Sequence, residues 1–394
     1  MGVKVDGQYF QFDYFFLRDA CTCPRCVHPS TQQKLFQTTD IPIDVRPQAA
    51  EALVDGSLRI MWRNDIPTFD SHESYYSLEF LRRYSTLRNR IRARYNDQRQ
   101  ILWDKKMMGK DVLYIDYSDY MTSDEALFRA VKHLSLYGLM FIRGIPKQQH
   151  DAIEGLASRI GNLKNTFYGM TWDVKSVKDS KNIAYTSLNL GLHMDLLYFE
   201  SPPGLQFLHC IQNTVTGGSS IFADSFRAAT LVRMNAPNLF QALTNFPVTF
   251  HYQNDGHHYY FARPTVVLDQ YSYVEQKRIS HVNWAPPFQA PFEIDIGGDY
   301  AAQFRQYIHA AKEFARYLED PDAQFELRLE EGVCVVFFNR RTLHSRREFD
   351  ALSGDRWLKG AYVDIDAFHS KYRTLSQQFR SEKNTTDDEY SWIR

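Results

Sequence analysis

From residue 111 onward the chain alternates short apolar runs with turn residues. Most runs suit a strand better than a helix: LMFIRG, GLQFLHCI, SSIFADSF, PVTFHYQ, GHHYYFAR, CVVFFN and WLKGAYVDI. Helices are predicted at FRAATLVRM, PNLFQALTNF and YAAQFRQYIHAAKEFARYL. A further helix is predicted over SDEALFRAVKHLSLYG, with Ser123 as its N-cap and Gly138 at its end. Many short strands flanked by helices indicate a mainly β fold of the double-sheet, jelly-roll type.

The pattern divides the chain into three parts. Residues 1–90 contain strand-like runs such as QYFQFDYFFL and LRIMW, which predict a small β-rich domain. Residues 91–110 lie in a strongly charged stretch with few apolar positions, and we expect a helical, solvated connector there. Residues 111–394 are then the jelly-roll domain.

Charge and hydropathy exclude several classes of partner. The 46 basic and 47 acidic residues nearly cancel, and no long run of one sign occurs, which argues against nucleic acid and anionic membranes. No apolar stretch reaches the length of a membrane span, and the start MGVKVDGQYF has no signal core. A secreted disulfide framework would have more cysteines than five and usually an even number, so we expect a reducing compartment and a cytoplasmic protein.

Three cysteines lie within six residues of one another. Cys21, Cys23 and Cys26 would present three thiolates in a tight turn, and free buried thiols are rarely spaced so closely. A structural zinc ion takes four nitrogen or sulfur ligands in a tetrahedron. His28 is near in sequence but too close in the loop to complete the tetrahedron, so the fourth ligand should come from elsewhere.

A second set of residues predicts iron chemistry. His193 and Asp195 are separated by one residue, and positions i and i+2 of a strand face the same side. His344 follows the apolar run CVVFFN, and two histidines with one carboxylate make a facial triad that leaves positions open for a 2-oxo acid and dioxygen. Arg356 could hold the distal carboxylate of 2-oxoglutarate. Taken singly, each of these residues is more often structural; the pattern favours an oxygenase.

These residues belong to a longer set of matching segments. LRDACTCPRC, FYGMTW, NIAYT, LHMD, PPGLQFLHCI, TVTGG, LHSRR and the GAY of WLKGAY occur in one order, nearly end to end. The chain therefore resembles the gamma-butyrobetaine dioxygenase and trimethyllysine dioxygenase family, and gamma-butyrobetaine dioxygenase more closely. The resemblance implies a double-stranded β-helix core, Fe(II), 2-oxoglutarate, dioxygen, ascorbate, a quaternary-amine substrate and a homodimer.

The resemblance also assigns roles to individual residues. It implies that His72 is the fourth zinc ligand and that Asn182 and Asn283 hold a substrate carboxylate. It implies an aromatic cage for the trimethylammonium group, made of Tyr168, Trp172, Tyr185 and Tyr362. Tyr168 and Trp172 would share a face if their segment were helical. The chain departs from the familiar pattern at Leu196, where a tyrosine is expected, and the loop between His344 and Arg356 is a residue short.

Three other functions compete with hydroxylation of gamma-butyrobetaine. Trimethyllysine or another quaternary amine could be the substrate of the same chemistry, which would require polar groups for an α-amine. A barrel that binds without turnover would lack an iron ligand or Arg356, and all four residues are present. An interaction module based on residues 1–90 would not need the complete site downstream.

Overall fold

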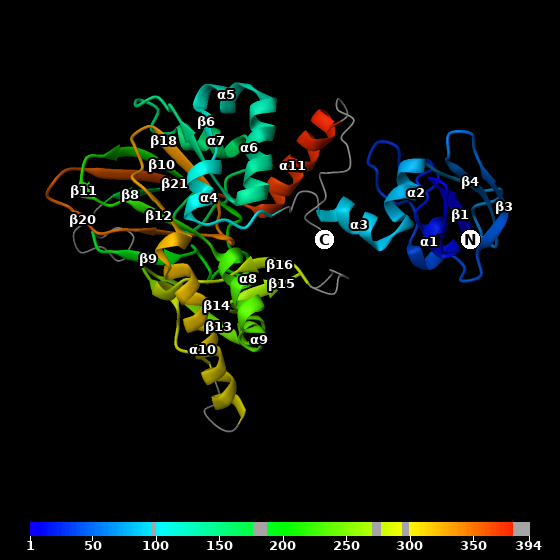
Figure 1. The fold of residues 1–394 in the computed structure, drawn as a ribbon. Coiled ribbons are helices and arrows are strands. Elements are labelled where there is room, and N and C mark those ends of the chain that lie inside the picture. The colour runs from blue at the N-terminus through cyan, green and yellow to red at the C-terminus, as the bar shows by residue number, and fades with distance from the viewer. Residues whose placement is uncertain (96–99, 176–186, 270–276, 294–298, 381–394) are drawn as a thin grey trace. The chain divides into compact units, whose positions relative to one another are not determined.

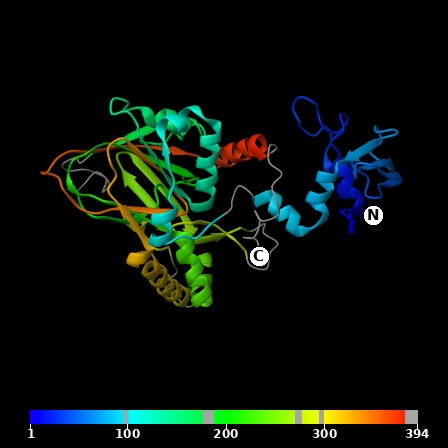
Figure 2. The same ribbon diagram turned by 45° about the horizontal axis from the view of Figure 1, so that its top comes forward.

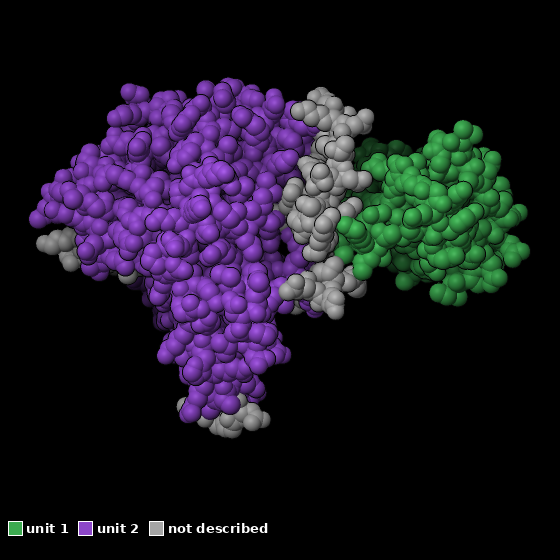
Figure 3. All heavy atoms as spheres, viewed as in Figure 1, with its two compact units in different colours: residues 1–96, 390–394 green, residues 97–389 purple. Residues whose placement is uncertain are grey.

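The computed structural model describes residues 1–95, 100–175, 187–269, 277–293 and 299–380. The chain forms two compact units, Met1–Asn96 and Asp97–Glu389, which Figure 3 colours separately. The division falls within the stretch expected to be a connector, residues 91–110. Each unit has its own hydrophobic core.

The first unit is built from a hairpin, a small sheet and three α-helices in its described part. The hairpin joins β1 (Gly2–Val5) and β2 (Gln8–Gln11) through Asp6 and Gly7, whose positive φ angles of 50° and 84° suit a two-residue turn. The other elements are β3 (Arg46–Ala52), β4 (Leu58–Arg63), β5 (Glu73–Tyr76), α1 (Tyr14–Asp19), α2 (Leu78–Ser85) and α3 (Leu87–Tyr95). Leu17, Ile60, Tyr76 and Leu81 are buried at the centre of this unit.

The second unit contains two facing sheets, as the jelly-roll prediction requires (Figures 1 and 2). Within the described residues the larger sheet has the order β6 (Tyr114–Asp116), β7 (Leu139–Arg143), β18 (Val333–Phe338), β10 (Leu205–Asn213), β21 (Arg356–Val363) and β8 (Thr171–Lys175). The smaller has the order β17 (Gln324–Leu327), β12 (Ser220–Asp224), β19 (Thr342–Arg346) and β9 (Leu190–His193). β11 (Thr216–Gly217) pairs with β20 (Phe349–Asp350).

Both faces of the strands β7 and β18 in the larger sheet are buried, so these two strands are apolar at nearly every position. Alternate residues such as Phe207 and Val336 pack against a helical layer, and residues such as Val335 and Leu358 pack in a separate core with Phe222 of the smaller sheet. The helical layer consists of α5 (Tyr117–Thr122), α6 (Asp124–Tyr137), α7 (Ala152–Ser158) and α11 (Ile365–Arg380). α4 (Lys105–Asp111) contacts β17.

α6 confirms the helix that the sequence predicts most clearly. Ser123 accepts a hydrogen bond from the Ala126 amide at the N-terminus, and Gly138 adopts the left-handed conformation at the C-terminus with φ of 72°. The apolar face of the helix, including Leu127 and Leu134, is fully buried against the larger sheet.

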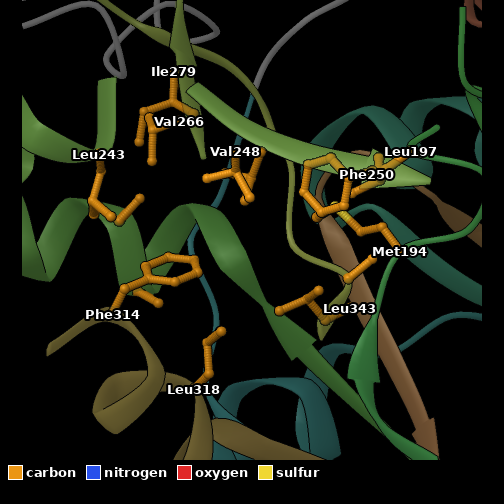
Figure 4. Packing of buried hydrophobic residues seen from close by; sticks show 14 of the residues in the cluster. Met194, Leu197, Leu243, Val248, Phe250, Val266, Ile279, Phe314, Leu318 and Leu343 are labelled. Atoms are coloured by element: carbon orange, nitrogen blue, oxygen red, sulfur yellow. The ribbon is translucent and has the colours of Figure 1, made fainter. Parts of the chain in front are cut away.

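The remaining elements pack together beside the smaller sheet. They are α8 (Ser225–Asn235), α9 (Pro237–Asn245), α10 (Asp299–Glu319), and the strand pairs β13 (Pro247–Asn254) with β14 (His257–Pro264) and β15 (Val266–Leu268) with β16 (Ile279–Val282). Figure 4 shows Phe314 and Leu318 from α10 and Leu243 from α9 in the same core as Met194 and Leu343. Met194 lies between His193 and Asp195 in the sequence, so this core anchors the segment that carries two candidate iron ligands.

Among the residues that the structure describes, no helix combines the length and the apolar character needed to cross a membrane.

Candidate active site and metal centres

The three predicted iron ligands come together at the edge of the smaller sheet. His193 ends β9, and His344 of β19 is its direct partner in the antiparallel register. The carboxylate oxygen Oδ1 of Asp195 lies 3.3 Å from Nε2 of His193 and 3.9 Å from Nε2 of His344. One ligand atom from each residue lies within 4.8 Å of the others. This two-histidine, one-carboxylate set fits Fe(II) with open positions for substrates.

The backbone around Asp195 differs from the predicted extended strand. β9 ends at His193, so Asp195 is not on the same extended strand; it lies in a turn. Leu196, the next residue, has a positive φ of 57°, which few branched residues adopt. Asp195 therefore reaches the histidines through a turn and not through strand alternation.

Hydrogen bonds hold the ligands in position. Nδ1 of His193 lies 2.8 Å from the Gly191 carbonyl, which can only accept, so Nδ1 donates and Nε2 is left to face the metal. The Asn339 side chain bonds the main chain of Asp195 twice: Oδ1 accepts from its amide at 2.8 Å, and Nδ2 donates to its carbonyl at 2.9 Å. The Tyr362 hydroxyl donates to Oδ2 of Asp195 at 2.6 Å.

The electrostatics keep the ligands in the ionisation states that a metal needs. Burial alone would raise the pKa of Asp195, but its contacts with His193, His344 and the Tyr362 hydroxyl lower it overall. Burial, with His193 nearby, lowers the pKa of His344 to about 3. Burial raises the pKa of Tyr362 well above its usual range, so its hydroxyl keeps its proton. An ionised carboxylate and a neutral imidazole are the metal-binding forms.

A cavity opens directly beside the iron ligands, and Arg356 lines it. Arg356, Leu358 and Tyr362 occupy alternate positions of β21, and all three line the cavity. Ala361 and Val363 point to the opposite face of the sheet, where they pack against the helical layer. Burial lowers the pKa of Arg356 only to about 10, so its guanidinium stays charged at neutral pH. Its Nε is buried without a hydrogen-bond partner in the described structure. A carboxylate from a ligand would satisfy it.

Three of the four predicted cage residues are described, and all three line the cavity. The Trp172 and Tyr362 rings stack with centroids 4.0 Å apart, and Tyr168 lies 6.3 Å from Trp172. Tyr168 and Trp172 do not share a helix, which their spacing in the sequence would allow, because Trp172 lies in β8 opposite Gly360 of β21. A Cβ atom at Gly360 would lie only 2.3 Å from the indole, so the glycine makes room for Trp172.

The two predicted asparagines do not both reach this cavity. Asn283 is buried and does not line it; its amide nitrogen donates to the Pro264 carbonyl at 2.6 Å, and its oxygen accepts from Arg340. The structure thus gives Asn283 a role in the chain fold, because a substrate carboxylate has no access to its amide there. Asn182 and Tyr185 lie outside the described residues.

The cavity also contains residues that sequence reasoning missed. Tyr198 and Phe288 extend its aromatic wall, with ring centroids 5.6 Å apart. Burial and the neighbouring Tyr168 raise the pKa of Tyr198 well above its usual range. Arg346 adds a second guanidinium and donates to the Leu188 carbonyl at 2.6 Å. Its position two residues after His344 on a strand was the signal that could have identified it.

The first unit brings the four predicted zinc ligands together. Nε2 of His72 lies 3.5 Å from Sγ of Cys21 and 3.4 Å from Sγ of both Cys23 and Cys26. A tetrahedral zinc ion with ordinary bond lengths would place nitrogen and sulfur about 3.5 Å apart. The donor set fits Zn(II) and leaves no position for a substrate, so the site is structural.

A buried chain of polar groups orients the histidine of the zinc site. Nδ1 of His72 bonds Oδ2 of Asp65 at 2.7 Å, which directs Nε2 toward the cysteines. Oδ1 of Asp65 accepts from Arg18, a residue with no exposed surface. His28 is exposed, and its Nδ1 accepts from the Thr31 amide, so it takes no part in the cluster.

Comparison with known proteins places both units in known families. Residues 97–362 match the family described as "Taurine catabolism dioxygenase TauD, TfdA family", and residues 4–82 match "Gamma-butyrobetaine hydroxylase-like, N-terminal". The fold and the iron site define an Fe(II)- and 2-oxoglutarate-dependent dioxygenase. The chain belongs to the TauD/TfdA dioxygenase family, in the branch that carries the gamma-butyrobetaine hydroxylase-like N-terminal domain.

Curated relatives match nearly the whole chain. "Dioxygenase str8" from Strobilurus tenacellus is 40% identical over 95% of this chain and 87% of its own length. "Gamma-butyrobetaine dioxygenase" from Pseudomonas sp. (strain AK-1) is 34% identical over 95% and 94%. "Trimethyllysine dioxygenase" from Meyerozyma guilliermondii is 27% identical over 94% and 92%. The enzyme class is common to all three names, and the substrate is not.

Proposed function

We propose that the protein hydroxylates C3 of gamma-butyrobetaine to give L-carnitine, as the name of the Pseudomonas relative suggests. One oxygen atom of dioxygen enters the C3–H bond of the substrate. The other enters 2-oxoglutarate, which loses carbon dioxide and becomes succinate. Iron(II), when bound by His193, Asp195 and His344, supplies the activation of dioxygen.

The aromatic wall beside the iron ligands is the observation that supports this proposal. A quaternary ammonium group cannot donate a hydrogen bond or lose its charge, so proteins hold it against π faces. Tyr168, Trp172 and Tyr362 line the cavity together with Tyr198 and Phe288. Each good cation–π contact contributes about 0.5–2 kcal/mol. These rings would hold the trimethylammonium end and leave the carbon chain facing the metal.

Arg356 would hold the other substrate, 2-oxoglutarate, by its distal carboxylate. Arg356 and Tyr362 lie on the same face of β21, near opposite ends of that strand. The positive charge and the aromatic group therefore lie toward different ends of the cavity. This separation lets the dicarboxylate and the cation bind at once without competing for one charge.

The cavity lining favours gamma-butyrobetaine over trimethyllysine, which carries an additional α-ammonium group. Asp195 is the only carboxylate among the described residues that line the cavity, and it is an iron ligand. An α-ammonium would lose its hydration there without gaining a free anionic partner. The similarity to trimethyllysine dioxygenase keeps that substrate as the alternative.

Succinate formation tests the proposal directly. The iron- and zinc-loaded protein is given 2-oxoglutarate, ascorbate and one amine at a time: gamma-butyrobetaine, its dimethylamino and primary amine analogues, or trimethyllysine. We expect gamma-butyrobetaine to stimulate succinate formation most, with carnitine as the product. Faster turnover of trimethyllysine would overturn the substrate assignment and leave the dioxygenase class unchanged.

Two variants test the aromatic wall. Trp172→Ala should raise the apparent KM for gamma-butyrobetaine by about tenfold, because 1–2 kcal/mol of cation–π contact is lost. Gly360→Ala should do the same less strongly, since the new methyl group displaces the indole. The KM for 2-oxoglutarate should stay nearly unchanged in both. Trp357→Ala is the matched control, because this tryptophan bonds Asp173 and does not line the cavity.

A further inference from the structure

A second cavity, of about 510 Å³, lies elsewhere in the larger unit. None of its described lining residues lines the cavity beside the iron ligands. Its wall includes Arg263 at the end of β14, His281 of β16, Arg340 in the turn after β18, and Arg278. Its volume lies within the range of small-molecule sites, roughly 300–1,000 Å³.

Two arginines of this wall, Arg263 and Arg340, lie in the same cavity, and the charge of Arg263 acts on Arg340. Burial and the charge of Arg263 lower the pKa of Arg340 to about 9. Burial and the charges of both arginines lower the pKa of the neighbouring His281 to about 2. At neutral pH two guanidinium groups thus share the cavity wall with a neutral imidazole, an arrangement that favours an anion between them.

The hydrogen bonds of these arginines go to neutral acceptors. Arg263 is 8% exposed and donates to the main-chain carbonyls of Phe199 and Glu200, while its Nε is buried without a partner in the described structure. Arg340 donates to the Asn283 side-chain oxygen and to the Val282 carbonyl at 3.5 Å. These contacts orient the guanidinium groups but do not neutralise their charge.

Two acidic residues of the cavity wall, Asp364 and Glu200, do not neutralise this pair either. Asp364 bonds Lys164 at 2.8 Å. Glu200 is near Arg263 and raises its pKa, but burial outweighs that effect, and the Glu200 residue is exposed to solvent. Burying a charge without an ionic partner is costly, and a bound oxyanion would remove that cost.

We propose that this second cavity is a binding site for a small oxyanion, with Arg263 and Arg340 as its ligands. A guanidinium group presents N–H donors in a planar fork that matches two oxygens of a phosphate or carboxylate. The volume exceeds what inorganic phosphate alone requires, so the oxyanion would belong to a small organic molecule. This site is independent of the iron chemistry and of the proposed substrate.

Calorimetric titration of the full, zinc-loaded chain with inorganic phosphate, and separately with acetate, tests the site. Iron is left out so that phosphate has no iron to bind, and ionic strength is held constant with chloride. We expect saturable binding of at least one probe. Tighter binding of phosphate would indicate a phosphate-bearing ligand, and tighter binding of acetate would indicate a carboxylate.

Three variants locate the binding. Arg263→Lys and Arg340→Lys keep the charge but lose the planar pair of N–H donors. Each should therefore raise the Kd of the bound probe about tenfold or more. Arg356→Lys, in the other cavity, should leave the Kd within about twofold. If Arg340→Lys does not fold, as judged by its thermal transition, Arg263→Gln replaces it and should weaken binding at least as much as Arg263→Lys, because the charge is lost as well. The proposal is wrong if neither probe binds, or if only Arg356→Lys reduces binding.

Discussion

The carboxylate of Asp195 uses its two oxygens for different tasks. Oδ1 faces the two histidines, and Oδ2 accepts the Tyr362 hydroxyl. The ring of Tyr362 stacks on Trp172, so one residue contacts both an iron ligand and the aromatic wall. A residue expected to serve only the substrate therefore also orients the metal ligand.

At this scale we predict that replacing Asp195 or His344 with Ala abolishes amine-coupled succinate formation. Loss of one ligand out of three removes most of the iron affinity, while the two sheets that position the site remain. Turnover is measured by succinate, and folding by circular dichroism. His258→Ala is the control, because that histidine is exposed and lies outside the ligand set. A variant of either ligand with near-native turnover would show that the iron site is elsewhere.

Among single residues, sequence reasoning recognised the ligands by their chemical type and their neighbours. It could not separate Asn283 from a substrate-binding residue, because an asparagine in a loop has the same local pattern in both cases. In the structure, the Asn283 side chain hydrogen-bonds to the Pro264 carbonyl and to Arg340, which are distant in sequence. Arg346 was missed although it shares a strand face with His344.

At the scale of elements, the iron site depends on hydrogen bonds between two turns. Asn339, in the turn between β18 and β19, makes the paired hydrogen bonds to the Asp195 main chain and also donates to the Pro203 carbonyl at 3.3 Å. Asn339 has no exposed surface. A side chain thus replaces the strand pairing that Asp195 lacks beyond the end of β9.

Asn339→Ala should therefore weaken the apparent affinity for Fe(II) about 10–100-fold, the usual effect of losing a group that orients a metal ligand. The affinity is measured by anaerobic titration of iron into the zinc-loaded protein. Tyr120→Phe is a matched control, since it also removes a buried hydrogen bond to a carbonyl but lies in the helical layer. Equal iron affinity in the two variants would show that Asn339 has only a structural role.

The prediction for α6, which has a strong periodic pattern, was correct, whereas the helix considered for the segment from Tyr168 to Trp172 was wrong. α6 has its caps and its apolar face in the sequence. The segment from Tyr168 to Trp172 has no such periodicity, and it became a turn followed by β8, because β21 offers pairing partners from Trp357 to Ala361. Long-range strand pairing decides such segments, and spacing within the segment does not reveal it.

At the scale of the whole molecule, zinc should stabilise the first unit without taking part in catalysis. We predict about one zinc per chain by elemental analysis. Cys23→Ser should lower the thermal stability of the first unit strongly, because binding of a structural zinc ion contributes directly to folding. Its turnover rate per folded molecule should change little.

Cys334→Ser provides the matched control for zinc. Cys334 is a buried cysteine in the larger unit and is not in the cluster, so the variant should keep one zinc per chain. Zinc-free protein purified without chelators, or Cys23→Ser with unchanged zinc content, would contradict the assignment.

Stability should also fall in mild acid, since the larger unit buries neutral histidines. Burial lowers the pKa of His209 to about 4, against about 6.5 in the unfolded chain. The stabilisation is fully present above pH 6.5 and is lost as pH falls toward 4, because only the unfolded chain then takes up the proton. The loss is at most about 1.4 kcal/mol per pH unit.

Urea unfolding at pH 7, 6 and 5 measures this effect. His209→Gln cannot take up the proton, so its stability should fall less over this range than that of the unmodified protein. Parallel curves for the two proteins would show that His209 does not contribute to the acid sensitivity.

Residue types and their order along the chain are enough to predict the chemistry of this protein. Ligand types and their order along the chain specify the metals, since His193, Asp195 and His344 suit iron, and three cysteines in six residues suit zinc, whatever the path of the chain between them. The periodicity of strands and helices likewise indicated a jelly roll, because the spacing of apolar residues within each segment shows which of its faces is buried.

Only the tertiary structure decided which distant groups meet. The stacking of Trp172 on Tyr362 over Gly360, the hold of Asn339 on Asp195, and the closeness of Arg263 to Arg340 all join residues from different elements. Such contacts depend on register between strands and on packing across sheets, which no local pattern encodes. The shape of the cavity beside the iron ligands follows from the first two of those contacts.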